Sequence, residues 1–315
     1  MHDQPIPRAV RIAALSRLWD SDIAYAFRTS PVAVLSALTI ALFMAATLLA
    51  PWLAPQNPFD PAALDIMDSN LPPAFTAGGD TRYLLGTDDQ GRDLLSGILF
   101  GARISLIVGI ASVAIAVLIG LGVGLAAGYL GGWVDAVLMR LADIQLAFPA
   151  ILLALLIDGI ARTVLPPDWL ADLQIWVIVG AIAISTWVQY ARTVRALVMS
   201  EKRKEYVLAG HVMGLSNRAI VFRHILPNVL TPVFVIGTIN FALAIMIESS
   251  LSFLGLGVPP TSPSLGTLIR IGSQYLFSGE WWITLFPALA LVTLALAVNL
   301  LGDWMRDTLN PKLGK

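Results

Sequence analysis

The side chains that most often carry catalysis or bind metals are scarce in this chain and lie outside its apolar stretches. There is no cysteine, which excludes disulfides, thiolate metal sites and a cysteine nucleophile. The three histidines, His2, His211 and His224, fall outside the apolar stretches, and no GxxxxGK[ST] phosphate loop occurs. No Ser/His or paired-carboxylate arrangement lies within those stretches. The sequence therefore predicts no catalytic site, no cofactor and no metal.

The segment Glu205–Asn228, EYVLAGHVMGLSNRAIVFRHILPN, instead has a pattern suited to binding another surface. Four apolar residues follow Glu205 at i+3, i+4, i+7 and i+8, which places them on one side of a helix. They are Leu208, Ala209, Val212 and Met213. An amphipathic helix of this kind needs something to cover its apolar face. Lipid headgroups, the rest of the protein and a second subunit all fit, whereas a DNA-reading helix pair does not suit a position between two apolar stretches.

Small residues and a proline organise the rest of this segment. A second stripe, which would let another backbone approach closely, consists of Tyr206, Gly210 and Gly214. Gly214 suits the C-terminal cap of the first helix, and Ser216 or Asn217 can cap a second helix. We expect this second, short helix to end by Pro227, because proline lacks the backbone N–H that a helix interior requires.

The composition indicates that lipid surrounds most of the chain. Of its 315 residues, 57% are hydrophobic and only 13% are charged, and the mean hydropathy is +0.77. A soluble domain carries about 25% charged residues. So few charges cannot cover a globular surface in water, and the chain is therefore expected to be an integral membrane protein.

Six stretches approach the roughly 20 apolar residues that a helix needs to cross a bilayer. They are Val32–Ala50, Ile104–Ala127, Ala136–Ile157, Ile175–Tyr190, Val229–Ile247 and Ile283–Leu301. The sequence thus predicts an all-α, polytopic membrane protein with six transmembrane helices. Of the 20 Lys and Arg residues, those on one side of these spans are only Arg82, Arg92, Arg103, Arg162 and Arg270. The positive-inside rule then predicts that both termini and the 192–228 loop are cytoplasmic.

Several residues have structural interpretations. A repeat of small residues on the second span, suited to close helix packing, consists of Gly120, Gly124 and Gly128. Polar residues expected to fold the external loop rather than to touch a substrate are Asp88, Arg92 and Asp93. Arg140 and Asp143 interrupt the third span, and we expect them to pair with each other near its inner end.

The segment 205–228 resembles the cytoplasmic signature loop of binding-protein-dependent ABC importer permeases, whose pattern is E-A-A-x3-G-x9-I-x-L-P. The residues in register are Ala209, Gly214, Leu226 and Pro227. The departures are Leu208 for the glutamate, Gly210 for the second alanine and His224 for the isoleucine. Glu205 lies one turn earlier and offers a carboxylate on the same face.

Longer stretches are similar to the C-type subunit of the dipeptide/oligopeptide permease family. They are LGTDDQGRDLLSGILFGARISLIVG, GGWVDAVLMRLADIQLAFPAILLALLI, ESSLSFLGLGVPP and NLLGDWMRDTLNPKL. The extra first span and its external loop are similar to that subunit's N-terminal extension. The resemblance implies an ABC importer type I permease fold. Its expected parts are a cytoplasmic tail (1–30), a first transmembrane helix with an external loop (31–101), a five-helix core (102–302) containing a cytoplasmic coupling loop (192–228), and a cytoplasmic tail (303–315).

The resemblance implies a permease subunit of an ATP-driven importer for di- or oligopeptides in the bacterial inner membrane, with no enzyme activity of its own. The partners it implies are a homologous permease, two ATP-binding subunits and a periplasmic or lipid-anchored binding protein, and no nucleic acid. The residues it assigns to ATPase coupling are Glu205, Tyr206, Leu208, Ala209, Gly210, Val212, Met213, Gly214, Leu215, Ser216, Leu226 and Pro227.

Two other residues are candidates for the pathway or its gate. Pro149, in LAFPA, predicts a kink in the third span, with a moving segment as the alternative. Glu248 ends the fifth span near the outer interface, and an acid at such a place is by default a site hypothesis. It could meet the α-amino group of a peptide, or it could be solvated or paired with Arg103, and we favour a structural role.

Two other classes of function stay open at this point. An ion-coupled secondary transporter would bind coupling ions near the midplane with polar side chains and broken helices, and these spans have almost none away from their ends. A membrane scaffold would use the amphipathic loop only for docking.

Overall fold

The computed structural model describes residues 22–58, 60, 64–258 and 262–309, so the two expected tails lie partly outside the described residues. In this part of the chain the regular structure is helical, apart from one isolated antiparallel bridge between Thr87 and Asp93. Five helices are long and apolar enough to cross a membrane, and a bent pair of helices makes a sixth span if it is counted as one. The predicted all-α fold is confirmed, and the predicted number of six spans holds when the bent pair is counted as one.

The helices follow one another along the chain with short connections, apart from residues 54–93 and 254–264. They are α2 (Asp22–Thr29), α3 (Pro31–Leu48), α4 (Ala50–Leu53), η2 (Ile66–Asp68), α5 (Leu94–Leu130), α6 (Gly132–Leu146), α7 (Ala150–Val164), α8 (Pro167–Glu201), α9 (Glu205–Val212), α10 (Asn217–Ala219), η3 (Ile220–Ile225), α11 (Leu226–Phe253), α12 (Leu265–Tyr275), η4 (Leu276–Ser278) and α13 (Trp282–Thr308).

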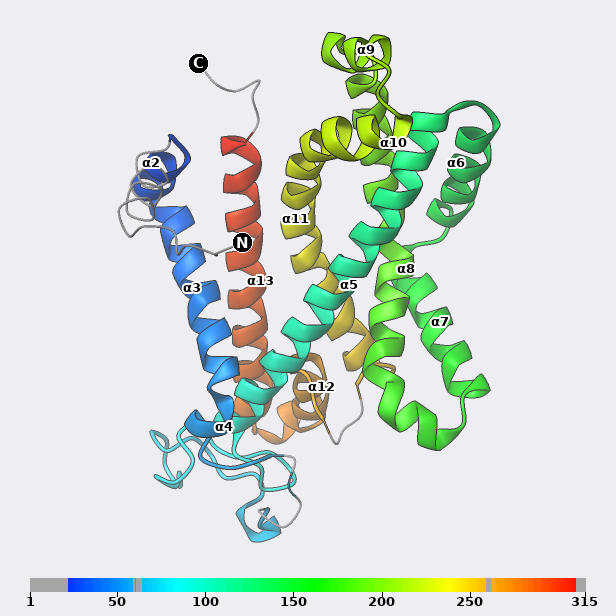
Figure 1. The fold of residues 1–315 in the computed structure, drawn as a ribbon. Coiled ribbons are helices and arrows are strands. Elements are labelled where there is room, and N and C mark those ends of the chain that lie inside the picture. The colour runs from blue at the N-terminus through cyan, green and yellow to red at the C-terminus, as the bar shows by residue number, and fades with distance from the viewer. Residues whose placement is uncertain (1–21, 59, 61–63, 259–261, 310–315) are drawn as a thin grey trace, which may run out of the picture.

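The long helices run between two ends of the molecule (Figure 1). At one end lie α2, α9 and the last turns of α13, and we call this the α9 end. At the other lie α4, α12 and the loop of residues 54–93, and we call this the α12 end. Helix α3 packs on α13, while α5 packs on α8 and α11 in the middle of the bundle.

Glycines bring α5 and α8 into close contact. A Cβ atom at Gly124 would lie 2.6 Å from the Cβ atom of Val194, and one at Gly128 would lie 2.8 Å from that of Val198. One at Gly120 would likewise overlap the backbone and side chains of α8. The close-packing role expected for the three glycines is confirmed, because any side chain there would push the two helices apart.

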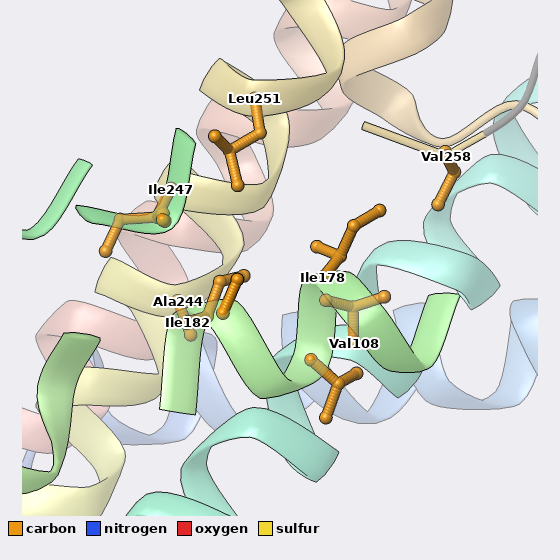
Figure 2. Close-up of a cluster of buried hydrophobic side chains, with 10 residues drawn as sticks. Val108, Ile178, Ile182, Ala244, Ile247, Leu251 and Val258 are labelled. Carbon is orange, nitrogen blue, oxygen red and sulfur yellow. The ribbon is translucent and has the colours of Figure 1, made fainter. Parts of the chain in front are cut away.

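A buried apolar cluster joins three of the long helices near the α12 end (Figure 2). Its labelled members are Val108 of α5, Ile178 and Ile182 of α8, Ala244, Ile247 and Leu251 of α11, and Val258. Side chains from α8 and α11 point toward one another in this view. This packing fixes the relative positions of the helices that carry the candidate site.

The third span is broken rather than kinked. Helices α6 and α7 meet at an angle of 90°, and Pro149 is the N-terminal cap of α7 with φ −57° and ψ 134°. This extended backbone cannot continue a helix, and proline also lacks the N–H that would bond to the preceding turn. The predicted third span, 136–157, therefore crosses a break at residues 147–149.

Helix α6 is tied to α8 by ion pairs. The carboxylate of Asp143 pairs with Arg192, and Arg195 donates to Asp135 across 2.6 Å. The predicted pairing of Asp143 with Arg140 is wrong, because α6 lies along α8 and places a guanidinium from that helix closer. Both Arg192 and Asp143 are about half exposed, so this pair guides helix position more than it adds stability.

The polar residues of the loop at the α12 end fold that loop, as predicted. Arg92 is 4% exposed, and its Nε donates to Asp88 over 2.6 Å. Asp93, fully buried, caps α5 by accepting from the backbone N–H of Ser96 at 2.8 Å. The backbone N–H of Asp93 in turn donates to Gln56 at 2.8 Å.

Candidate functional site

Helix α9 ends in a complete glycine cap. Gly214 has φ +77°, a left-handed conformation that glycine adopts without strain. The N–H of Leu215 donates to the carbonyl of Gly210 and the N–H of Gly214 donates to that of His211, each at 3.0 Å. These are the two bonds of a Schellman motif. The predicted cap at Gly214 is confirmed, and it sharply reverses the chain after α9.

The helix that follows does not stop at Pro227. The side chain of Ser216 caps it by accepting from the N–H of Ala219 at 3.3 Å, and the helical segment then runs from Asn217 to Phe253. A wide π turn at η3 precedes the proline, and the N–H of Leu226 bonds back to the carbonyl of Val221. The prediction of a stop at Pro227 is wrong, because Pro227 sits in the first turn after η3, where its missing N–H does not break a regular α-helical ladder.

The inner side of α9 belongs to the core of the protein. Val207 is 1% exposed and packs in one cluster with Ile220 and Ile225 of η3, both fully buried. A Cβ atom at Gly210 would already touch Leu215 at 3.4 Å. Gly210 therefore faces the chain itself, whereas Gly214 of the same predicted stripe is exposed.

A polar network fixes α9 to the two long helices beside it. The hydroxyl of Tyr206 donates to Glu201 at the end of α8 and accepts from Asn228 of α11 at 3.1 Å. Partial burial, and next the hydrogen bond to Glu201, raise the pKa of the Tyr206 phenol. Asn228 also donates to the carbonyl of His224 at 2.8 Å. These hydrogen bonds join α9 to both α8 and α11.

A second link joins this segment to the end of α5. Lys202 donates to the carbonyl of Tyr129 at 2.6 Å, with its ammonium 5.1 Å from the centre of the Tyr129 ring. The Tyr129 hydroxyl donates to Asn217 at 2.9 Å. The sequence pattern did not indicate these anchors or Glu201 and Asn228, since each bond joins positions on different helices.

The outer side of α9 exposes the apolar stripe that the sequence predicted. Val212 is 89% exposed, Met213 72% and Leu208 53%. Glu205 and Ala209 are exposed beside them, and nothing lies within 4 Å of the place a Cβ would take at Gly214. We call the exposed residues Glu205, Leu208, Ala209, Val212, Met213 and Gly214 the α9 face. In Figure 1 it lies on a helix that projects beyond the ends of the long helices.

Glu248 occupies a different environment from the one expected. It is fully buried, and its carboxylate accepts from Ser105 of α5 at 2.8 Å and from Ser252 at 2.7 Å. Ser249 adds a longer contact of 3.4 Å. Solvation and pairing with the exposed Arg103 are both wrong for this structure. We call Glu248 with these three serines the serine cage.

A further buried polar group lies near the cage. Asp158 of α7 is fully buried and pairs with Arg162 at 2.7 Å. Arg162 also donates to the carbonyl of Gly257 at 3.0 Å. A Cβ atom at Gly257 would overlap Ser252, so α7 and the serine cage meet at one turn. The one local signal for this pair is the i, i+4 spacing of Asp158 and Arg162.

These features define a class: a polytopic helical membrane protein that presents a rigidly mounted apolar surface at one end of its spans. Two family models match the chain. Residues 119–315 match the binding-protein-dependent transport system inner membrane component, and residues 17–73 match the N-terminal transmembrane domain of oligopeptide transport permease C.

Curated relatives extend this similarity over almost the whole chain. The di/tripeptide transport system permease protein DppC of Pseudomonas aeruginosa is 37% identical, with 99% of this chain and 98% of the relative covered. The dipeptide transport system permease proteins DppC of Haemophilus influenzae and Escherichia coli are 36% and 37% identical, covering 99% and 98% of this chain and 99% and 96% of those proteins.

The chain therefore belongs to the family of binding-protein-dependent transport system inner membrane components. It is a bacterial inner membrane permease subunit of an ABC importer, and ATP hydrolysis takes place in separate subunits.

Proposed function

We propose that this chain forms half of the translocation pathway of an importer for di- or oligopeptides and passes the movement of the ATPase to that pathway through α9. The named substrates of its relatives support the cargo. The α9 face carries the coupling part of the proposal. It consists of exposed apolar side chains on a helix whose other side is built into the core.

The α9 end is proposed to face the cytoplasm. Basic residues gather there on and after α8, among them Arg192, Arg195, Lys202, Arg203 and Lys204. Positive charge in the segments next to spans is typical of the cytoplasmic side. In this orientation α9 would meet ATP-binding subunits, and the loop of residues 54–93 would meet the binding protein.

The partners proposed are a homologous permease, two ATP-binding subunits and a periplasmic or lipid-anchored binding protein. Leu208, Val212 and Met213 would fill the apolar part of a groove in the ATPase, and Glu205 would contact its rim. Because Tyr206 and Val207 hold α9 to the long helices, a rigid-body movement of the ATPase would move α8 and α11 as well.

The two pathway candidates take separate roles in this proposal. The 90° break next to Pro149 is the joint at which α6, held to α8 by ion pairs, would change its angle to α7. Glu248 would hold the outer ends of α5 and α11 together through the serine cage and would not touch the peptide.

The first experiment is a crosslink from the α9 face. The chain has no native cysteine, so Met213→Cys gives one reactive group at a site that is 72% exposed. Ser216 is a poorer choice because its side chain caps the next helix. Phe277→Cys, 98% exposed in η4 directly after α12, is the matched control.

In membranes containing the assembled importer, M213C is expected to crosslink to the ATP-hydrolysing subunit and to change its yield with nucleotide, whereas F277C is not. Peptide uptake should fail on ATP depletion. Uptake that survived ATP depletion but not loss of the proton gradient, with no M213C crosslink, would replace this proposal by an ion-coupled transporter.

A further inference from the structure

Two bulky apolar side chains are displayed at the tip of the loop of residues 54–93. Ile66 is 77% exposed and Met67 is 88% exposed, side by side on the short helix η2. In Figure 1 this light-blue helical turn is the described part of the chain that lies farthest from α9. It projects beyond the ends of the long helices, so the hydrocarbon core of a bilayer does not cover it. We call Ile66 and Met67 the loop tip.

Charged side chains hold the loop tip in a fixed shape. Asp65 caps η2 by accepting from the N–H of Met67 at 2.9 Å. Asp68 accepts two bonds from the Arg82 guanidinium, at 3.0 and 3.1 Å, and a third from the hydroxyl of Tyr83 at 2.8 Å. A bidentate guanidinium–carboxylate pair is geometrically specific. The bond from Tyr83, and next those from Arg82, lower the pKa of Asp68 and keep it charged at neutral pH.

Hydrogen bonds to backbone carbonyls connect the loop tip to the beginning of α5. The hydroxyl of Thr87 donates to the carbonyl of Asp68 at 2.6 Å, and the N–H of Asn70 donates to that of Asp88 at 2.9 Å. A Cβ atom at Gly91 would overlap the carbonyl of Asp65. Because residues 88–93 lead directly into the capped start of α5, the loop tip is rigid with respect to a transmembrane helix.

The loop that carries the tip has a net negative charge, although Asp88 and Asp93 are buried. Residues 54–93 contain seven Asp and two Arg, with no Glu or Lys. Both arginines are already paired with aspartates of the same loop, Arg82 with Asp68 and Asp80, and Arg92 with Asp88. An acidic surface is repelled by anionic lipid headgroups and attracts a protein surface that carries Lys and Arg.

We propose that the loop tip is a docking contact for the importer's substrate-binding protein, which would receive Ile66 and Met67 in an apolar depression flanked by basic residues. The inference rests on the proposed function, since it places this loop outside the cell membrane. A preorganised apolar pair loses little conformational entropy on binding, which makes it suited to be an interface hot spot.

Replacing an apolar side chain of the tip by a carboxylate tests the proposal. The wild-type importer, Met67→Asp, Ile66→Asp and the control Phe277→Asp are assembled in nanodiscs with all subunits, and the affinity for the purified binding protein of the same importer is measured. Both tip variants are expected to weaken binding by at least about tenfold, and F277D by less than about twofold. Binding should also weaken with salt, because exposed charges are screened.

Equal affinities for wild type and the tip variants, or an equal loss in F277D, would overturn the assignment to the loop tip. If the wild-type importer itself failed to bind the protein, the proposed function would be at fault and not the tip. Correct assembly is checked by size-exclusion chromatography of the nanodiscs, in which the M67D importer is expected to elute with all of its permease and ATP-binding subunits.

A fluorescent label distinguishes a protein partner from lipid. Met67→Cys, in this chain without native cysteine, is labelled with an environment-sensitive fluorophore such as bimane. The emission is expected to shift to the blue only when the binding protein is added. A blue-shifted emission in nanodiscs alone, insensitive to the binding protein, would show that the tip lies in the headgroup layer and would overturn the proposal.

Discussion

The α9 face and the serine cage place side chains in opposite ways. At the α9 end, apolar residues such as Val212 stand in the open on a helix that projects past the spans. Near the α12 end, the carboxylate of Glu248 is fully buried between transmembrane helices. Either arrangement is unfavourable by itself, since an exposed apolar side chain and a buried polar group without hydrogen bonds both raise the free energy of a folded protein.

The serine cage and the α9 face differ in which groups offset this unfavourable free energy. Glu248 is satisfied within the chain by hydroxyls from two helices. Among the residues that the structure describes, none covers the apolar side chains of the α9 face, and in the proposed function the ATPase supplies that cover. Changes in the cage should therefore alter the stability of this chain, and changes on the α9 face should alter its association.

The largest effect is expected from Glu248→Ala. The substitution opens a cavity and leaves the hydroxyls of Ser105 and Ser252 without their acceptor, which should cost about 3 kcal/mol of unfolding free energy. Thermal unfolding of the detergent-solubilised chain, followed by tryptophan fluorescence, should show a midpoint about 5–10 °C lower. Glu248→Gln keeps the shape and an acceptor and should lose far less. Equal losses for both variants would mean that the charge, not the cage, matters.

The second largest effect is expected at the close contact between α5 and α8. Gly120→Ala would place a Cβ against the backbone of α8, including the carbonyl of Trp187 at 2.8 Å, and should cost about 1–3 kcal/mol. Gly122→Ala, two residues along the same helix, meets nothing within 4 Å and should be neutral or slightly stabilising. The same thermal measurement compares them. A neutral Gly120→Ala would show that these helices have room to separate.

A substitution on the α9 face is expected to weaken association with the ATPase and to leave the stability of the chain unchanged. The side chain of Val212 is 89% exposed, so Val212→Asp should leave the midpoint of thermal unfolding within about 1 °C of wild type. It should lower both the affinity for the ATPase and peptide-coupled ATP hydrolysis by at least about tenfold. Val212→Leu keeps an apolar side chain and should retain most of the coupling. A stable Val212→Asp importer with normal coupling would remove this face from the interface.

The smallest effect concerns the anchor of α9. Tyr206→Phe removes the hydroxyl that bridges Glu201 and Asn228. Because the folded-state pKa of this phenol is raised, its stabilisation is fully present below the unfolded pKa of about 10 and is lost as the pH rises through the folded pKa. The stability difference between wild type and Tyr206→Phe should therefore shrink above about pH 10. A difference that grew with pH would show that the phenolate is the stabilising form.

Local patterns predicted much of this structure. The apolar stretches identified the spans, and Gly214 identified the end of α9 because only one backbone conformation suits that position. The exposed stripe at Leu208, Val212 and Met213 also followed from spacing alone. In each case the deciding interactions lie within one or two helical turns.

Interactions between distant residues could not be predicted in this way. Ser105 is far from Glu248 in sequence, and Arg192 is far from Asp143, so neither pairing leaves a local pattern. The continuation of the helix through Pro227 depends on the π turn before it, which residue types alone did not indicate. The 90° break at Pro149 likewise depends on how α6 and α7 each pack against α8.

The π turn at Ile220–Ile225 sets a rotational phase. A hydrogen bond there closes over five residues instead of four, as between Leu226 and Val221, so the turn holds one residue more than an α-helix would. Each α-helical residue advances the chain by about 100° and 1.5 Å. Deleting a single residue from η3 would thus turn α9 by roughly 100° about the axis of α11. The direction in which Val212 and Met213 point, relative to the spans, is fixed by one surplus residue.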